Sequence, residues 1–363
     1  MKEKRKSSKL KGIIVFMACL WFLPSVEGAD VPPGRPFQEL LDLINNLQNS
    51  VNNLQNGTSD LQNRVTALER TEPVVFGLDC ATQSINNTLP FLKPGDTLLV
   101  IGVCNDNVTI GEEIRRITLD GRGTATINGP NPGIPTLNIR GQGITIRGFT
   151  ISGGETGITV NRGGIATIDR NTIQNAATIG ILVGQQSSAR IVNNTIQNNP
   201  EEGILVNENS FARIGFVNTP DAGTSPNLIL MNGDSGIHVT RSSSARIIGN
   251  TISNTTAGSG IQVSRASHAE ISSNTINGNS EHGIFVTQNS GVNLGRDTGA
   301  GIFDAPNSTT ANNILNGIRC LLNSYADGRL GSLNGAAGAK NFLSINPTSP
   351  APNSGGCHDS LLP

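Results

Sequence analysis

Residues 180–206 read GILVGQQSSARIVNNTIQNNPEEGILV, so a Gly-Ile-Leu-Val segment is repeated after 23 residues. The same segment or a close copy recurs along the chain at spacings of 23, 23, 33, 24, 23 and 34 residues. A period in this range, lengthened at two places, is typical of a stacked repeat and not of a globular domain. The copies begin at Gly157, Gly180, Gly203, Gly236, Gly260, Gly283 and Gly317.

Each period contains three short strand-like segments joined by turns rich in Gly, Asn and Ser. In the quoted stretch these segments are Ala-Arg-Ile at Ala189, Asn-Thr-Ile at Asn194 and Gly-Ile-Leu-Val at Gly203. None has the length or the 3.6-residue period of a packed helix. Short strands that repeat in parallel must coil, each turn pairing with the previous one. The sequence therefore predicts an all-β parallel β-helix of roughly ten turns, with the Ile and Val of Gly-Ile-x-Val pointing inward.

An asparagine recurs nine or ten residues before the following Gly-Ile segment. Stacked asparagines form amide ladders in other repeating β-structures. We expect this column to lie at a corner of the solenoid, with its amides bonded to one another and to turn backbone. Its members are Asn171, Asn194, Asn227, Asn250 and Asn274.

The start of the repeat region, from about Val74, resembles a known family. Ser84 to Leu89, Lys93 to Val100, Asn107 to Ile110 and Ile117 to Gly121 are similar to the capping helix and first turns of the right-handed parallel β-helix, or pectin-lyase-like, superfamily. This resemblance implies a right-handed solenoid over residues 74–363 with an N-terminal cap. The family contains lyases, hydrolases, epimerases, esterases and proteins without known activity, so the fold alone assigns no function.

Strict catalytic motifs of that family are missing from the sequence. There is no aspartate pair with Gly-His-Gly, no Trp-x-Asp-His and no Asp-Pro-His-Asp, and Glu281-His282-Gly283 is explained by the repeat itself. We interpret His238, His268 and His282 as surface residues. The resemblance therefore transfers no catalytic residue.

The N-terminus has the pattern of an export signal. Six basic residues among the first eleven precede an apolar run from Ile13 to Leu23, which is too short to span a bilayer. We expect a cleaved signal peptide over 1–28, a linker over 29–36, and a mature chain without a transmembrane segment that is secreted or held at the cell surface. In the alternative, Cys19 is lipid-modified and anchors the chain. Removal of 1–28 changes the formal net charge from −1 to −5, which argues against a nucleic-acid partner.

A heptad pattern separates the linker from the repeats. Leucines recur every seven residues from Leu40 to Leu68, and apolar or β-branched residues precede each by three, starting at Phe37. This pattern predicts a coiled-coil stalk over 37–70 that makes the chain a parallel homo-oligomer, with dimer and trimer both open. The alternative is a single amphipathic helix packed on the first turn of the solenoid, since Gly57 interrupts the run.

Four cysteines remain in the mature chain, two near each end of the solenoid. Pairing within each end is the simplest of three connectivities and suits an oxidising compartment. The expected bridges are Cys80 with Cys104 and Cys320 with Cys357.

Candidate site residues lie in two outward columns. The middle position of Ala-x-Ile carries Arg190, Arg213 and Arg246, and guanidinium groups stacked one turn apart match a repeating carboxylate or sulfate polymer. The position two residues before Gly-Ile carries Glu201 and Asp234 on neighbouring turns. These carboxylates are candidates for sharing a proton or a calcium ion, although solvated turns also attract acidic residues.

Two functions follow from these columns. The first is an oligomeric protein that binds an extracellular polysaccharide or surface without catalysis and without a cofactor. The alternative is a lyase or epimerase on a uronate polysaccharide, with calcium as its ion, carboxylates such as Glu201 and Asp234, and an arginine such as Arg213 or Arg246 as the base. The mature chain contains no Trp and one Tyr, Tyr325, so it lacks the usual aromatic platforms for sugar rings. This absence and the missing motifs favour the first function.

Overall fold

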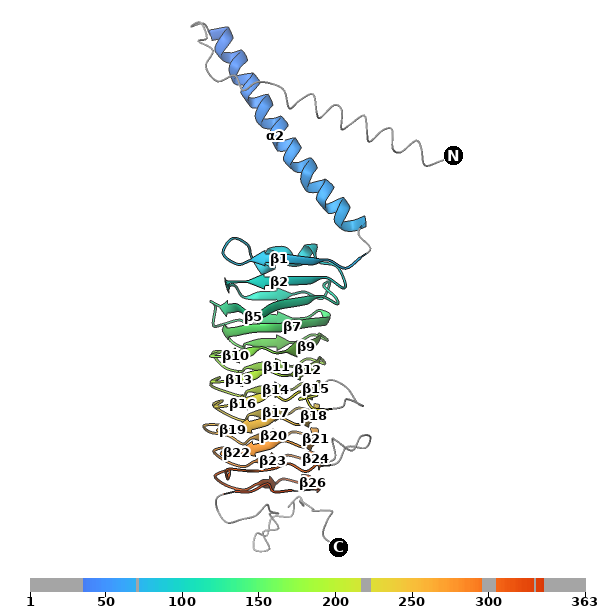
Figure 1. Ribbon diagram of the computed structural model, residues 1–363, viewed down its shortest axis with the longest axis vertical. Coiled ribbons are helices and arrows are strands. Elements are labelled where there is room, and N and C mark those ends of the chain that lie inside the picture. Colours follow the sequence, from blue (N-terminus) through green and yellow to red (C-terminus); the bar gives the residue numbers. More distant parts are fainter. Residues whose placement is uncertain (1–34, 70–71, 217–222, 296–304, 330, 336–363) are drawn as a thin grey trace, which may run out of the picture. The chain divides into compact units, whose positions relative to one another are not determined.

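A computed structural model describes residues 35–69, 72–216, 223–295, 305–329 and 331–335 (Figure 1). The chain divides into two compact units, Met1–Arg70 and Thr71–Pro363. The predicted signal peptide with Cys19, most of the linker and Cys357 lie outside the described residues.

The first unit contains one long helix, α2 (Arg35–Glu69). Its side chains are described from Gln38 to Gln62, where all of them are exposed or half-buried. The predicted helix is therefore present. Within the described part of the chain, no helix has the length and apolarity needed to cross a membrane.

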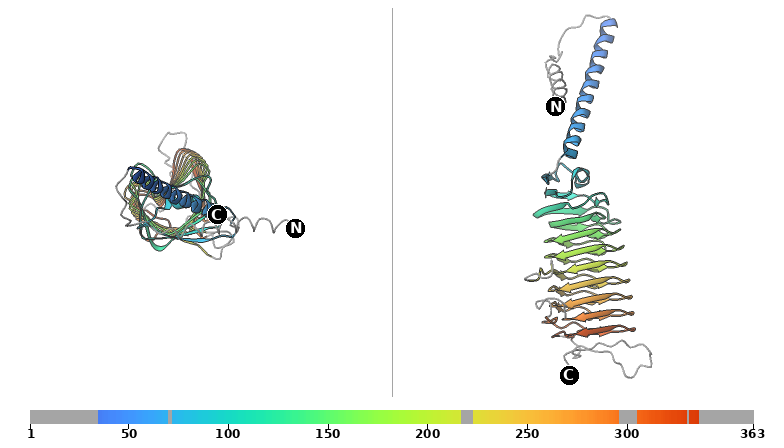
Figure 2. Two further views of the ribbon diagram at one scale, coloured as in Figure 1. Left: turned by 90° about the horizontal axis from the view of Figure 1, so that it is seen from above. Right: turned by 90° about the vertical axis from the view of Figure 1, so that its right-hand side faces the viewer.

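The second unit is a solenoid whose turns lie one above another (Figure 2). Its first turn is closed by a short cap made of α3 (Ile85–Thr88) and a 3-10 turn, η1 (Leu89–Phe91), which bury Ile85 and Leu89. The resemblance implied such a cap. It covers the apolar end of the first turn, where no further turn can stack.

All named strands of the unit pair in parallel and form two sheets. Sheet A has 17 strands. They are β1 (Val75–Asp79), β2 (Thr97–Ile101), β3 (Val103–Asn105), β5 (Thr118–Gly129), β7 (Gln142–Gly153), β9 (Ile165–Asp169), β10 (Thr172–Gln174), β12 (Ser188–Val192), β13 (Thr195–Gln197), β15 (Phe211–Ile214), β16 (Leu228–Leu230), β18 (Ser244–Ile248), β19 (Thr251–Ser253), β21 (His268–Ser272), β22 (Thr275–Asn277), β24 (Gly291–Leu294) and β26 (Tyr325–Gly328).

Sheet B has nine strands, one from each turn. The described solenoid thus has about nine turns, whereas the sequence predicted roughly ten. The difference arises in the first turn, where α3 and η1 take the place of a sheet B strand after β1. The strands are β4 (Val108–Ile110), β6 (Leu137–Ile139), β8 (Ile158–Val160), β11 (Ile181–Val183), β14 (Ile204–Val206), β17 (Ile237–Val239), β20 (Ile261–Val263), β23 (Ile284–Val286) and β25 (Ile318–Cys320).

The predicted inward residues form the core. In sheet B, Ile181 pairs in register with Ile204, and Ile204 with Ile237; all three are fully buried. Each turn consequently places the same apolar group over the same group of the turn below. Burial of one such side chain stabilises the fold by about 1.5–3 kcal/mol.

The asparagine column is buried at a corner of the solenoid. The Oδ1 of Asn227 accepts hydrogen bonds from the backbone N–H and the Nδ2 of Asn194, at 2.9 and 3.0 Å, and Asn250 accepts in the same way from Asn227. The Nδ2 of Asn227 also donates to the carbonyl of Ile191 at 2.8 Å. Each amide therefore links two turns and leaves no polar atom of the corner unpaired.

Two further buried ladders were not recognised in the sequence. Asn199 donates through its Nδ2 to Asn232 at 2.9 Å, and Asn279 donates to Asn313 at 2.8 Å. A serine ladder runs along another turn position, at Ser187, Ser210, Ser243, Ser267, Ser290 and Ser324.

The expected bridge between Cys80 and Cys104 is present and joins the first two turns of the solenoid. The second expected bridge includes Cys357, which lies beyond the described residues. Buried Cys320 is 1% exposed.

Candidate functional site

The arginine column lies on the outer face of sheet A. Strand pairing sets Arg190 beside Arg213 and Arg213 beside Arg246, one turn apart each. Neighbouring strands lie about 4.8 Å apart. Thr167 precedes the row and Glu270 ends it, where Arg246 Nε donates to Glu270 Oε2 at 2.6 Å.

Two of the three arginines also cover a buried aromatic ring. The guanidinium carbons of Arg213 and Arg246 lie 5.9 and 5.0 Å from the ring centroid of Phe216, which is fully buried. Phe216 follows β15, at the start of the first lengthened turn. Cation–π contacts of this kind orient a guanidinium group without neutralising it.

A groove of about 300 Å³ opens on this face at the upper end of the arginine row. Phe211 is half-buried there, and the Nε of Arg190 is buried without a hydrogen-bond partner. A buried donor without a partner is uncommon in a folded protein, so the guanidinium group of Arg190 keeps hydrogen-bonding capacity that the described residues do not use. The outward lining comes from Ile165, Thr167, Ser188, Arg190, Phe211 and Arg213.

Phe211 is a functional candidate that the sequence interpretation missed. That interpretation looked for Trp and Tyr as sugar platforms, whereas Phe211 stands beside Ala212 in an ordinary copy of the repeat. Its partners across the sheet are Ser188 and Ser244. The signal available was a large aromatic residue between two serines in a repeat column that carries a second aromatic, Tyr325, on its last described turn.

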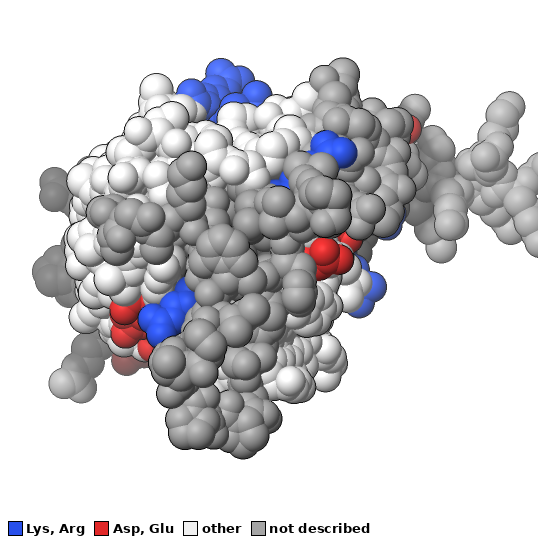
Figure 3. Space-filling view, turned by 90° about the horizontal axis from the view of Figure 1, so that it is seen from below, with Lys and Arg blue, Asp and Glu red and all other residues white. Residues whose placement is uncertain are grey.

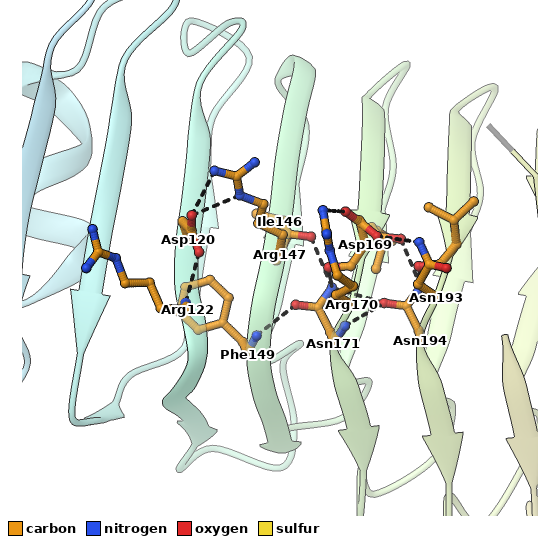
Figure 4. Close-up of polar contacts among 12 residues, drawn as sticks. Asp120, Arg122, Ile146, Arg147, Phe149, Asp169, Arg170, Asn171, Asn193 and Asn194 are labelled. Carbon is orange, nitrogen blue, oxygen red and sulfur yellow. Dashed lines mark hydrogen bonds and ion pairs between the residues drawn. The ribbon is translucent and has the colours of Figure 1, made fainter. Parts of the chain in front are cut away.

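A second hollow, of about 410 Å³, lies on earlier turns and was also missed (Figure 4). Arg147 binds the Oδ2 of Asp120 through its Nε and a terminal nitrogen, at 2.9 and 2.8 Å. Arg170 pairs with Asp169 at 2.6 Å. The exposed side chain of Arg122 extends away from Asp120 in Figure 4. The lining residues are Asp120, Arg122, Gly123, Arg147, Gly148 and Arg170.

Glycine allows close packing of the turns beside this second hollow. Gly148 has a φ of +70°, and a Cβ there would meet the backbone nitrogens of Gly123 and Arg122 at 2.9 and 3.0 Å. The turns around Gly148 therefore pack closely and bring Arg122, Arg147 and Arg170 around one space. Arg147 aligns with Asp120 on β5 and with Asp169 on β9, so this hollow borders the same face of sheet A as the groove.

The acidic column lies elsewhere on the solenoid. Glu201 and Asp234 stack on adjacent turns, and the backbone N–H of Asp234 donates to the carbonyl of Glu201 at 3.0 Å. Burial, followed by the charges of Glu202, Asp234 and Glu155, raises the pKa of Glu201 above its ordinary value. Among the described residues, no group of three or more His, Cys, Asp or Glu side chains is placed to hold a metal ion.

The structure does not bring the two columns together. Glu201 lies between β13 and β14, whereas the arginines lie on β12, β15 and β18. In Figure 1 the strands β13, β16 and β19 lie on one side of the solenoid and β15 and β18 on the other. Viewed from below, Lys and Arg (blue) and Asp and Glu (red) form a few small patches, some of them side by side (Figure 3).

Two histidines differ from the surface position expected for them. His282 is 3% exposed, and burial, helped by the charge of Arg319, lowers its pKa to about 4. His238 is half-buried and bridges three turns, because its Nδ1 lies 3.0 Å from Glu202 and its Nε2 lies 2.9 Å from Ser264. Ser264 is only 2% exposed, so a polymeric substrate cannot reach this series of hydrogen bonds. The bonds instead connect the three turns.

One comparison with known protein families agrees with this architecture. A family described as "Right handed beta helix region" matches residues 106–219 and 209–328. Among curated proteins, no sequence matches significantly. Similar solved structures include the pectate lyase Pel9A, with 13% identity, a TM-score of 0.48 and coverage of 80% of this chain and 83% of that one. Another is an alginate lyase from Paenibacillus sp. str. FPU-7, with 16% identity, a TM-score of 0.40 and coverage of 79% and 99%.

Proposed function

The chain belongs to the right-handed β-helix family, and from this premise we propose that it binds an acidic extracellular polysaccharide along the outer face of sheet A, without catalysis. The observation that carries the proposal is the groove that Arg190, Arg213 and an aromatic side chain, Phe211, line together.

The chemistry of the groove suits a charged sugar. A guanidinium group donates parallel hydrogen bonds to a carboxylate or a sulfate. The face of an aromatic ring packs on the apolar side of a sugar ring. Arg190 and Phe211 provide one group of each kind on adjacent strands, β12 and β15.

The repeat extends this chemistry along the solenoid axis. Arg190, Arg213 and Arg246 occupy three successive turns, which spans about 10 Å at the usual strand spacing. The hollow at Arg122, Arg147 and Arg170 adds positive charge on the turns before them. A polymer with an acidic group on successive sugars meets several of these cations at once, whereas a neutral polymer meets only Phe211.

The alternative function is a lyase or epimerase that acts on a uronate polysaccharide. Such an enzyme needs two protein groups that reach the same sugar unit: a carboxylate that acts as an acid or binds a metal ion, and a base. Both must lie within hydrogen-bond distance of the reacting atoms. Glu201 and Asp234 lie on a different side of the solenoid from Arg213 and Arg246. This separation favours binding over catalysis. A calcium ion held by Glu201 and Asp234 belongs only to the alternative, catalytic function.

An oxidising location accords with the bond between Cys80 and Cys104. Structural disulfides persist in secreted and cell-surface proteins and are rare in reducing compartments. We therefore place the mature chain, from Ala29 onward, outside the cytoplasm.

The test measures binding of the chain from Ala29 to pectate, alginate, a sulfated glycan and a neutral glucan by isothermal titration. We expect binding to the acidic polymers only, with affinity that falls as salt rises. Arg190→Gln and Phe211→Ala should each weaken it about tenfold. Arg319→Gln, which removes the same charge from the outer face of sheet B, is the matched control and should bind like the parent.

Catalysis is followed in the same samples. Lyase activity would appear as ultraviolet absorbance of unsaturated uronates, and epimerisation as a change in the sugar proton resonances. Either activity, abolished by Glu201→Gln or Asp234→Asn, would establish the alternative. Equal binding of neutral and acidic polymers would refute the proposed function.

A further inference from the structure

Helix α2 carries an apolar stripe that is left exposed in the part of its unit that the structure describes. Leucines at one heptad position are 52–71% exposed, and Ile44 at the partner position is 50% exposed. Monomeric proteins rarely expose a contiguous apolar surface of this length. The leucines are Leu40, Leu47, Leu54 and Leu61.

The stripe has the geometry of a coiled-coil seam. Leu40, Leu47 and Leu54 are separated by seven residues, and Ile44 and Val51 lie between them. This alternation of Leu with β-branched residues is the pattern of parallel coiled coils, in which each layer packs against its own copy in the neighbouring helix. At about 1.5 Å per residue, the 35 residues of α2 form a seam of about 52 Å.

Charge along the seam permits pairing of identical chains. Between Gln38 and Gln62 the positions that flank the stripe are Leu41, Leu43, Gln48, Ser50, Gln55, Gly57 and Gln62. The charged residues of this window, Glu39, Asp42 and Asp60, occupy heptad positions away from the stripe. Between Gln38 and Gln62 a second copy therefore meets no like charge beside the seam, and a highly charged partner of another kind finds no complementary group there.

We infer that α2 binds further copies of this chain as a parallel coiled coil, so that the arginine faces of several solenoids act together on one polymer. In a parallel bundle all the helices end on the same side. Since each solenoid follows the C-terminal end of its own α2, all the solenoids begin at that end of the bundle. Linked binding faces raise the apparent affinity for a repeating ligand without any new contact. The joint binding of one polymer by several solenoids rests on the proposed function, whereas the association of the helices does not.

The mass of the complete chain from Ala29, measured by light scattering, tests the association. We expect a mass that is a whole multiple of the monomer's, and a monomer for Leu47→Asp/Leu54→Asp, which places two carboxylates in the seam. The matched control is Asn49→Asp/Asn56→Asp, which adds the same charges on the opposite face of the same helix and should keep the parent mass. A monomeric parent at micromolar concentration would overturn the inference, as would an unchanged mass of the seam variant.

Orientation is tested with Leu40→Cys under mild oxidation. Parallel, in-register helices place the two introduced cysteines opposite each other, within the reach of a disulfide bond, so a covalent dimer is expected on a non-reducing gel. Asn49→Cys, on the outer face, should give none. An oligomer that fails to cross-link through Leu40→Cys would overturn the parallel arrangement.

Shared binding is tested by comparing a surface coated with the acidic polymer and a short oligosaccharide of it in solution. The seam variant should bind the surface at least about tenfold more weakly than the parent and the oligosaccharide equally well. Equal binding of parent and seam variant to the surface would refute the shared action. Failure of both proteins to bind either ligand, with the masses as expected, would refute only the proposed function.

Discussion

The asparagine column and the arginine column have the same repeat and opposite environments. Asn194, Asn227 and Asn250 are about 1% exposed, and each amide bonds to the next turn. Arg190 and Arg213 stack at the same spacing, but they line an open groove. In the first column the repeat satisfies its own polar groups; in the second it places like charges side by side.

This difference separates stability from recognition. A buried amide whose donors and acceptors are all used by neighbouring turns has nothing left for a ligand, and its loss leaves several groups unpaired. A row of like charges at a half-buried surface contributes little to folding but creates a local field that attracts an oppositely charged polymer. Substitutions in the two columns should therefore affect different measurements.

The largest expected effect is that of Asn227→Ala in the middle of the ladder. The change removes the bonds to Asn250 and Ile191 and leaves the N–H of Asn194 unpaired, so we expect a loss of about 4 kcal/mol in the free energy of unfolding. Denaturant unfolding followed by circular dichroism measures this loss. The control is Asn105→Ala at an exposed site, with an expected loss below about 0.5 kcal/mol; equal losses would contradict the distinction between the columns.

Protonation of a buried base should have the next largest effect. Because the pKa of His282 is lowered to about 4 from its ordinary value of 6.5, the unfolded chain takes up this proton first as the pH falls. The stability of the folded state is then full above about pH 6.5, declines toward pH 4 and loses up to about 3 kcal/mol from this group. His282→Gln should flatten that decline in melting temperatures measured across the range, and an unchanged slope would show that His282 is already charged in the fold.

A smaller effect, on binding alone, is expected from Arg190→Gln. Arg190 is half-buried and its buried Nε has no hydrogen-bond partner to lose, so unfolding should change by less than about 1 kcal/mol, while affinity for an acidic polymer falls about tenfold. Isothermal titration and denaturant unfolding of the same protein sample test both statements. A large loss of stability would make Arg190 a structural residue like Asn227.

The smallest effect should come from Arg122→Gln at the second hollow. An exposed guanidinium contributes less than about 1 kcal/mol to an ion pair, so we expect affinity to fall by about threefold and the salt dependence of binding to become shallower. Titrations at two salt concentrations measure this change. Arg329→Gln, an exposed arginine near the last described turn, should leave both quantities unaltered, and identical results for the two variants would exclude the hollow from the binding face.

The repeat made much of the fold predictable. A period of 23 residues sets the same residue over itself on every turn, so the inward Ile and Val and the three strands per turn could be inferred without coordinates. The first disulfide was predicted separately, from two cysteines near the same end of the solenoid. The irregular first turns were harder. The register shift between Asp120 and Ala125 breaks the period there, so the cluster of Asp120, Arg122 and Arg147 carried no repeat signal.

The sequence by itself determined which residues share a column, because stacking at a fixed period needs only chain length and alternation. Only the tertiary structure decided which columns lie on the same side of the solenoid and which are buried. It placed Glu201 and Asp234 in turns after β13 and β16, away from Arg213 on β15, brought Phe211 and Arg190 to one groove, and buried His282 and Ser264. The physical reason is that the bend at each corner sets the direction of a whole column, and that bend depends on turn backbone and on packing between turns, which no local pattern records.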